Sequence, residues 1–144
     1  MNKEISSNIA TNVAFKIQEI VSNTTTAGEI IDTADYDGGA SFFIQSGTLT
    51  DGTYTPLIEE GDDSALSDAA AVADIDLYRK GVATGQEANA VFALTDDDEI
   101  HKLAYIGTKR YIRLSIVSAA TSSGGFMGAI AVKDPEIKDV GDGS

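Results

Sequence analysis

The stretch that decides the fold is Ile100–Val117, IHKLAYIGTKRYIRLSIV, in which apolar and polar side chains alternate along two short runs. A period of two is typical of a β-strand that has one face on a core and the other on water. Gly107, Thr108 and Lys109 separate the two runs and have the composition of a tight turn. We therefore predict a hairpin of two half-buried strands. One face of its second strand carries Ile112, Leu114 and Ile116, and the other carries Tyr111, Arg113 and Ser115.

The same alternation recurs in short runs along the rest of the chain. We predict further strands at residues 13–21, 29–32, 40–46, 53–60, 75–78, 88–95 and 126–132. Turn-forming residues separate these runs at intervals of about 8–12 residues, a spacing typical of β-sandwiches and barrels. Residues 61–74 are expected to form a loop or a single helical turn. The pattern predicts an all-β fold: an antiparallel β-sandwich, jelly-roll-like, with eight or nine short strands.

The strand predicted at residues 40–46 has apolar side chains on both sides, with Phe42 and Ile44 on one side and Phe43 on the other. A strand with this composition is typically covered on both faces of its sheet. We therefore expect both faces of this strand to be covered.

The strand predicted at residues 53–60 follows the pair Asp51-Gly52, which favours a hairpin because glycine tolerates a positive φ. We predict that this strand pairs with the strand before it. Pro56 has no N–H to donate to a ladder, so the strand is expected to be an edge strand or to carry a bulge.

The domain organisation follows from length and composition. The chain has 144 residues, enough for one domain with a hydrophobic core. We assign residues 1–12 to a polar N-terminal arm, residues 13–133 to the β-sandwich domain and residues 134–144 to a polar C-terminal tail. No apolar run approaches the roughly 20 residues of a membrane helix, so no membrane association is expected. The N-terminal sequence also lacks the apolar core of a secretory signal.

The charge is strongly acidic and unevenly distributed. The formal net charge is −13; residues 1–78 hold two Lys and 14 acidic residues, and residues 79–144 hold eight basic and nine acidic ones. Such a surface repels phosphate backbones, so nucleic-acid binding is not expected. Four of the ten Lys and Arg residues lie within Ile100–Val117.

This local concentration of basic residues includes an aromatic side chain. Because Tyr and Arg are enriched at the centres of protein interfaces, we predict that a partner binds here and that it offers acidic groups. The alternative is a solvated sheet face with no partner. The residues of this predicted partner-binding site, called the basic patch below, are Lys109, Arg110, Tyr111 and Arg113.

The sequence offers little reactive chemistry. It has no Cys, and His101 is its only histidine, expected to be solvated at the start of a strand. A Ser-His-Asp triad would need His101, and no G-x-S-x-G motif accompanies it. The acidic runs 62–63 and 96–98 lie in predicted turns, and run 59–60 ends the strand beside the first of them, so these carboxylates are expected to be solvated alike. We therefore predict no catalytic residue, no enzyme activity and no cofactor.

A calcium site was considered at Asp35-x-Asp37-Gly38, which is a fragment of a calcium-binding loop. The full loop pattern fails, because Gly39 occupies the fifth position and no Glu falls at the twelfth. The Asp62-Asp63 and Asp96–Asp98 runs do not match either. We therefore predict no metal site and interpret these residues as turn formers.

Four segments together resemble a known group of proteins. They are residues 32–43, Gly52–Thr55, Glu59–Asp63 and above all Leu103–Leu114, with the run Tyr-x-Gly-x-Lys-Arg-Tyr-x-Arg as the most specific part. Over roughly residues 13–135, the chain resembles small proteins encoded in the structural gene clusters of tailed bacteriophages. Such proteins are taken as capsid decoration, or cement, proteins on shells of HK97-like subunits. Several known cement proteins are jelly rolls or related β-sandwiches.

The resemblance implies a phage virion structural protein that binds the outside of the capsid shell and stabilises it. Its partners would be the major capsid protein with the HK97-like fold and neighbouring copies of itself, as a homo-oligomer or on the shell. It would be made in the bacterial host cytoplasm and reside on the capsid exterior. The open edge at residues 53–60 or the arm at residues 1–12 would add to a partner's sheet.

Two alternatives remain open at this point. The chain is also compatible with another virion part, such as a tail, head-completion or fibre-associated β-domain. A carbohydrate- or calcium-binding β-sandwich module is the other alternative, because fold alone does not decide function.

Overall fold

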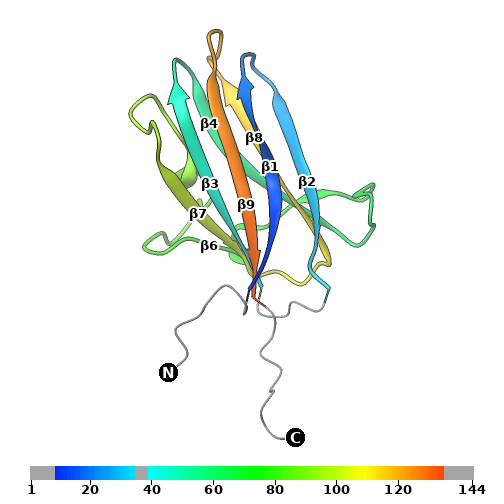
Figure 1. Ribbon diagram of the computed structural model, residues 1–144. Coiled ribbons are helices and arrows are strands. Elements are labelled where there is room, and N and C mark those ends of the chain that lie inside the picture. Colours follow the sequence, from blue (N-terminus) through cyan, green and yellow to red (C-terminus); the bar gives the residue numbers. More distant parts are fainter. Residues whose placement is uncertain (1–8, 35–38, 135–144) are drawn as a thin grey trace, which may run out of the picture.

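Two antiparallel β-sheets face each other in the computed structural model, which describes residues 9–34 and 39–134 (Figure 1). The strands are β1 (Ala10–Ile20), β2 (Thr25–Asp32), β3 (Ala40–Leu49), β4 (Thr53–Gly61), β5 (Ala70–Ala71), β6 (Leu77–Tyr78), β7 (Ile100–Tyr105), β8 (Tyr111–Ala119) and β9 (Gly125–Lys133). Two short 3-10 helices are η2 (Asp74–Asp76) and η3 (Ala88–Ala90). One sheet has the order β1-β9-β3-β7-β6 and the other β2-β8-β4-β5. The predicted antiparallel β-sandwich is confirmed.

The strand order is that of a jelly roll when the two-residue strand β6 is set aside. Successive strands then alternate between the two sheets, except that β4 and β5 pair with each other. Jelly rolls are built from two Greek keys, so most strands pair with partners that are distant in the sequence. Here β9 pairs with both β1 and β3 and thereby joins the end of the chain to its beginning.

The hairpin predicted within Ile100–Val117 is wrong, although both of its strands exist. β7 pairs with β3 and β6, whereas β8 pairs with β2 and β4. Residues 106–110, the crossing segment, therefore pass from one sheet to the other. The Tyr105 side chain holds this segment: its hydroxyl accepts the Lys109 N–H at 2.9 Å, and its ring lies against Gly107. A Cβ on Gly107 would lie 2.6 Å from the Tyr105 Cζ.

The hairpin predicted at Asp51-Gly52 is wrong for the same reason. β3 and β4 belong to different sheets, and this turn also connects the two layers. The turn chemistry itself was predicted correctly, since Gly52 has a φ of +87°. The Asp51 carboxylate accepts N–H groups of the neighbouring loop at 2.9 Å from Ser123 and 2.9 Å from Gly124. These hydrogen bonds hold the pKa of Asp51 well below its usual range.

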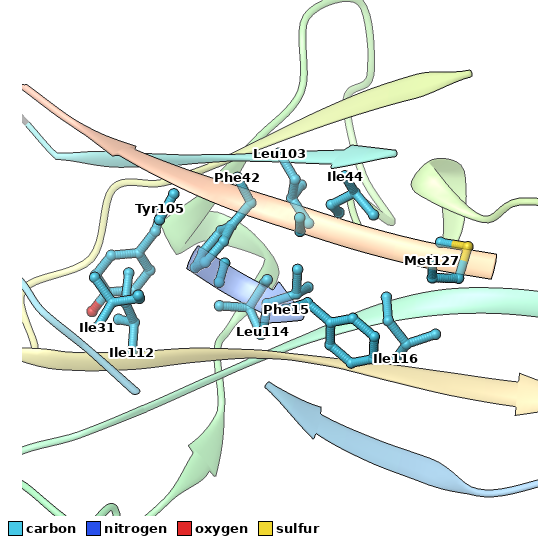
Figure 2. Packing of buried hydrophobic residues seen from close by; sticks show 14 of the residues in the cluster. Phe15, Ile31, Phe42, Ile44, Leu103, Tyr105, Ile112, Leu114, Ile116 and Met127 are labelled. Atoms are coloured by element: carbon cyan, nitrogen blue, oxygen red, sulfur yellow. The ribbon is translucent and has the colours of Figure 1, made fainter. Parts of the chain in front are cut away.

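The hydrophobic core fills the space between the sheets (Figure 2). Alternation determines which side chains enter it, and the predicted inward face of β8 is confirmed. Burying one large apolar side chain in this core contributes about 1.5–3 kcal/mol to the stability of the fold. The fully buried large residues include Phe15, Phe42, Ile44, Leu103, Tyr105, Ile112, Leu114, Ile116 and Met127.

The strand predicted at residues 88–95 is wrong. Residues 88–90 form η3, and Phe92 makes an isolated bridge to Tyr54, with each N–H donating to the other's carbonyl at 2.9 Å. The alternation of apolar and other side chains in this segment arises because Ala90 and Phe92 are buried. Two buried side chains at this spacing do not require a strand that pairs along its whole length. The segment closes over one side of the sandwich next to β4.

Pro56 is explained by the outer side of β4. On that side Tyr54 bonds to Phe92, and the Ile58 N–H donates to the Glu87 carboxylate. The short strand β5 covers only Glu59 and Glu60. Alternation directs the missing N–H of Pro56 to this same side, where no ladder partner is required. The β4 register with β8 carries no bulge, and β5 is the edge strand of this sheet, so β4 lies at the edge only around Pro56. The predicted open edge is, however, largely covered by other parts of the chain.

The first and last long strands mark the two ends of the β-sandwich. β1 begins at Ala10, inside the segment assigned to the arm, and β9 ends at Lys133. Residues 1–8 and 135–144, as well as the calcium-loop fragment at residues 35–38, lie outside the described residues. Residues 61–74 form a loop with β5 near its end, and the strand expected at residues 75–78 is reduced to β6. The described residues include no helix with the length and hydropathy that crossing a membrane requires.

Candidate functional site

The fold brings the four residues of the basic patch together at the start of β8. Lys109 and Arg110 lie in the crossing segment, and Tyr111 and Arg113 point outward from the four-stranded sheet. The Arg110 guanidinium lies over the Tyr111 ring, 5.0 Å from its centroid. The predicted proximity of these side chains is therefore present in the structure.

Each cation of the basic patch is paired with a carboxylate of the same chain. The contacts are Lys109 Nζ to Asp62 Oδ2 at 2.6 Å, Arg110 Nε and Nη2 to the two Asp32 oxygens at 2.9 Å each, and Arg113 Nη2 to Glu59 Oε1 at 2.9 Å. The patch consequently presents matched ion pairs to its surroundings. An acidic partner at this position would compete with carboxylates that are already in place.

The ion pairs of the patch differ in burial. The Arg113 and Glu59 side chains are only 22% and 21% exposed, and the Ser115 hydroxyl also donates to Glu59 Oε1 at 3.2 Å. The Arg110–Asp32 pair is half exposed. Its two hydrogen bonds, helped by the Ala34 N–H, lower the pKa of Asp32 to about 2. The Arg113–Glu59 pair is thus largely buried, whereas the Arg110–Asp32 pair lies at the surface.

A second surface lies on the outer face of the five-stranded sheet, and sequence reasoning did not assign it as a site. Cross-strand register places Val13 opposite Ile130, Ile130 opposite Phe43, and Phe43 opposite Lys102. These contacts form a row across β1, β9, β3 and β7. The apolar residues of this outer surface, called the apolar face below, are Val13, Ile17, Phe43, Ile100, Phe126 and Ile130.

The apolar face is hollowed into a shallow groove along β1 and β9. Ile17 is 86% exposed and packs over Gly128, where a Cβ would lie 2.7 Å from the Ile17 Cγ1. Single exposed apolar side chains are ordinary, but a contiguous set on one sheet face is typical of an interaction site.

One sequence signal pointed to this surface. Residues 40–46 have apolar side chains on both sides, and the structure buries Phe42 and Ile44 while Phe43 faces outward. Among the residues that the structure describes, this strand is covered on its core face only. The expectation of cover on both faces is therefore met on one face.

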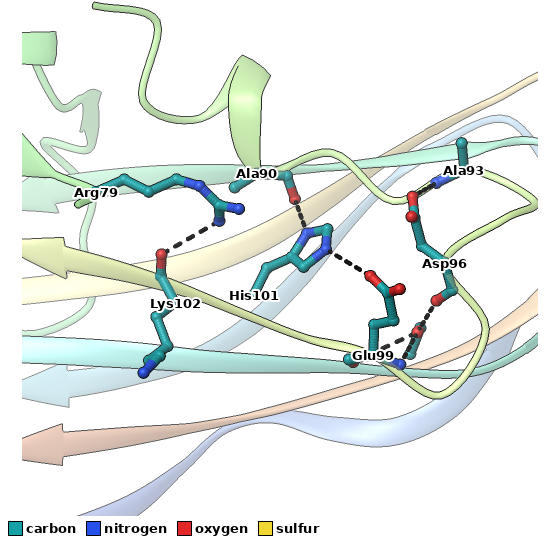
Figure 3. A network of polar contacts seen from close by, with 8 residues as sticks. Arg79, Ala90, Ala93, Asp96, Glu99, His101 and Lys102 are labelled. Atoms are coloured by element: carbon teal, nitrogen blue, oxygen red, sulfur yellow. Dashed lines mark hydrogen bonds and ion pairs between the residues drawn. The ribbon is translucent and has the colours of Figure 1, made fainter. Parts of the chain in front are cut away.

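A third group of side chains lies where the segment after η3 meets β7 (Figure 3). His101 faces the inner side of the sheet: its side chain is 12% exposed and its ring stacks on Phe92 with centroids 3.8 Å apart. The expectation of a solvated histidine is therefore wrong. Asp96, Glu99 and His101 bring one possible ligand atom each within 4.8 Å of one another. Sequence reasoning missed this acid–histidine cluster, because it treated residues 96–99 as a uniformly solvated turn.

Taken together, the fold and its surfaces define an antiparallel jelly-roll β-sandwich with one apolar sheet face that no other part of residues 9–34 and 39–134 covers. Comparison with known proteins adds little to this description. No protein-family model and no curated protein matches the sequence. Among solved structures, the SPBc2 prophage-derived protein YomS is similar, with a TM-score of 0.49 and 10% identity, over 87% of this chain and 93% of that chain. At this level of similarity, function has to be argued from the residues of the chain itself.

Proposed function

We propose that this chain is a phage virion structural protein that binds the outside of the capsid shell and stabilises it through the apolar face. The observation that carries the proposal is the set of apolar side chains on β1, β9, β3 and β7 that no other described element covers, bordered by Lys102, which lies over the Phe43 ring. The phage context comes from the sequence resemblance centred on Tyr105–Arg113.

The physical argument starts from the cost of leaving this surface in water. Burial of each large apolar side chain yields at most about 1.5–3 kcal/mol, and these residues are already partly covered. Association consumes several kcal/mol in lost freedom of motion, so one copy on one subunit would bind weakly. Many copies on a symmetric shell, each also touching its neighbours, turn weak contacts into firm attachment.

Charge supports the same orientation. The formal net charge of −13 opposes random association between free copies. The basic patch belongs to the crossing segment and to the outer face of the opposite sheet, so it remains accessible when the apolar face is covered. An acidic neighbouring copy would compete there with the carboxylates of Asp62 and Asp32, which already pair with Lys109 and Arg110.

The experiment uses heads of the phage that encodes this chain, prepared without it, and measures co-sedimentation of the purified protein. Ile17→Glu places a charge at the most exposed position of the apolar face and is expected to reduce binding at least about tenfold, as expected for a charge forced against an apolar surface. The matched control is Ile75→Glu in η2, where the side chain is 83% exposed and lies outside the apolar face.

The control variant is expected to bind as the unmodified chain does. Equal binding by the two variants would contradict docking through the apolar face. Recovery of the protein with tails and not with heads would contradict the capsid assignment and favour another virion part.

A further inference from the structure

The acid–histidine cluster forms where the turn after Phe92 meets the first residues of β7. Asp96 and Glu99 come from the turn, and His101 is the second residue of the strand. Neither the basic patch nor the apolar face uses these side chains, so the cluster requires its own explanation (Figure 3).

The His101 ring is held in one orientation by contacts outside the cluster. Its Nδ1 lies 3.0 Å from the carbonyl oxygen of Ala90, and Phe92 stacks on one ring face. An Nδ1–H that donates to this carbonyl leaves the Nε2 lone pair on the opposite side of the ring. Metal-binding histidines are typically oriented by such a backbone carbonyl, which fixes the tautomer.

The Nε2 side of the ring faces an acceptor. Glu99 Oε2 lies 3.4 Å from Nε2, so a lone pair and a carboxylate oxygen face each other across this gap. Such a contact is favourable only when a positive charge lies between the two atoms. That charge is either a second proton on the ring or a cation bound from solution.

The carboxylates are arranged for a cation. One Asp96 oxygen accepts the Ala93 N–H at 2.7 Å, and its second oxygen has no such bond within the described residues. The Glu99 side chain is half exposed, which gives an ion access from solvent. The backbone of the turn is fixed by Ser46, whose hydroxyl accepts the Glu99 N–H at 3.0 Å and donates to the Asp96 carbonyl.

We propose that Asp96, Glu99 and His101 form a binding site for a first-row divalent transition ion, with Zn²⁺ as the best fit. One imidazole nitrogen and two carboxylate oxygens suit zinc, which commonly takes three protein ligands and a water. Calcium is disfavoured because it prefers six or more oxygen ligands. The bound ion would tie the turn at residues 93–99 to β7 and so stabilise the segment that closes over β4.

The test uses the full chain without a histidine tag, stripped with a chelator and titrated with ZnCl₂ alone. We expect saturable binding with one ion per chain in calorimetry. At a concentration about 100 times the dissociation constant, zinc should raise the melting temperature by roughly 5–10 °C. CaCl₂ and MgCl₂ at the same concentration should not change the melting temperature.

His101 provides a direct reporter, because the sequence contains no other histidine. Long-range nitrogen–proton NMR spectra of its ring should show Nε2, and not Nδ1, shifting when zinc is added. The same spectra recorded without metal at pH 7 identify a doubly protonated ring, which is the alternative source of positive charge.

Two variants and one control complete the test. Losing a residue that only supports a metal ligand typically weakens metal binding by roughly 10–100-fold. Glu99→Gln and His101→Gln each remove a proposed ligand, so each should weaken zinc binding by more than this. Asp98→Asn removes a charge from the same turn outside the cluster and should leave binding unchanged. The Glu99 variant keeps the ring stacked on Phe92, so it remains informative if the His101 variant fails to fold. The proposal is overturned if zinc causes no Nε2 shift, or if Glu99→Gln binds zinc as tightly as the unmodified chain.

Discussion

Tyr105 joins parts of the chain that are far apart in sequence. Its ring is buried in the core, while its hydroxyl donates to Glu60 Oε2 at 2.6 Å and accepts the Lys109 N–H at 2.9 Å. Burial and the Glu60 carboxylate raise the pKa of this hydroxyl. The phenol therefore stays protonated and connects β7, β4 and the crossing segment.

Removing this hydroxyl tests its contribution. Tyr105→Phe leaves the Glu60 carboxylate and the Lys109 N–H without this partner, so we expect a loss of about 1–3 kcal/mol in the free energy of unfolding. Urea denaturation monitored by circular dichroism measures the loss. Tyr78→Phe, at an exposed tyrosine, is the control and should change stability by less than about 0.5 kcal/mol. Equal losses of stability in the two variants would contradict a stabilising role of the Tyr105 hydroxyl.

Arg113 and Lys16 form ion pairs that differ in exposure. Arg113→Ala leaves the largely buried Glu59 carboxylate without its cation, and we expect a loss of about 1–3 kcal/mol. Lys16→Ala breaks an exposed pair with Glu29 and should cost less than about 1 kcal/mol. Thermal melts of both variants provide the comparison. A stability loss for Arg113→Ala that does not exceed the Lys16→Ala loss would argue that Arg113 is available to a partner.

Asp32 makes stability depend on pH in the acid range. Its pKa is lowered from 3.8 to about 2 in the folded protein, mainly by the hydrogen bonds from Arg110. A lowered folded-state pKa stabilises the protein above the unfolded-state value, and this stabilisation is lost as the pH falls from 3.8 towards 2. We expect Asp32→Asn and Arg110→Gln to flatten the dependence of the urea midpoint on pH in this window. Profiles unchanged from the unmodified chain would contradict the pairing.

At the scale of elements, the strands were largely predictable and their partners were not. Alternation located β3, β4, β7, β8 and β9 because it reports which side chains enter the core. Pairing was assigned from proximity in sequence, and in a jelly roll successive strands lie mostly in different layers. A positive φ at Gly52 and a bend at Gly107 are compatible with a connection between the two sheets as well as with a hairpin. These local signals therefore did not distinguish the two.

The candidate sites were predictable to different degrees. The residues of the basic patch are consecutive or nearly so, which made their proximity predictable, but their carboxylate partners come from β2, from β4 and from the loop after β4. Phe43 gave a partial signal for the apolar face. The acid–histidine cluster could not be predicted, because it depends on the path of the turn before β7 and on the inward direction of His101.

Gly28 in β2 lies between the backbone of β8 in its own sheet and the backbone of β1 in the other sheet. A Cβ there would lie 2.2 Å from the Leu114 carbonyl oxygen and 2.3 Å from that of Ala14, so backbone from both sheets would have to move. We expect Gly28→Ala to destabilise the fold by about 3 kcal/mol, the upper end of overpacking costs. Denaturation midpoints measure the effect, with Glu29→Ala next to it as the control. A neutral result would mean that the contact between the sheets is looser than described.

At the scale of the whole molecule, the two candidate surfaces predict opposite responses to salt. Contacts through the apolar face do not weaken when salt screens charges, whereas contacts through the basic patch do. We expect retention on heads to be unchanged or stronger when the salt concentration rises from about 0.05 to 0.5 M, a range that shortens the screening length several-fold. Co-sedimentation across this range measures the response. Release at high salt would assign the shell contact to Arg110 and its neighbours.

The outer backbone of β4 is closed by partners from its own chain: Phe92 at Tyr54, Glu87 at Ile58 and β5 at Glu59 and Glu60, with Pro56 contributing no donor. Unsatisfied strand backbone would act as a template on which further chains polymerise into fibrils. With this template occupied, copies of this chain meet through their side chains and do not extend a shared backbone ladder. The closed edge of β4 therefore favours chains that remain separate molecules at high protein concentration.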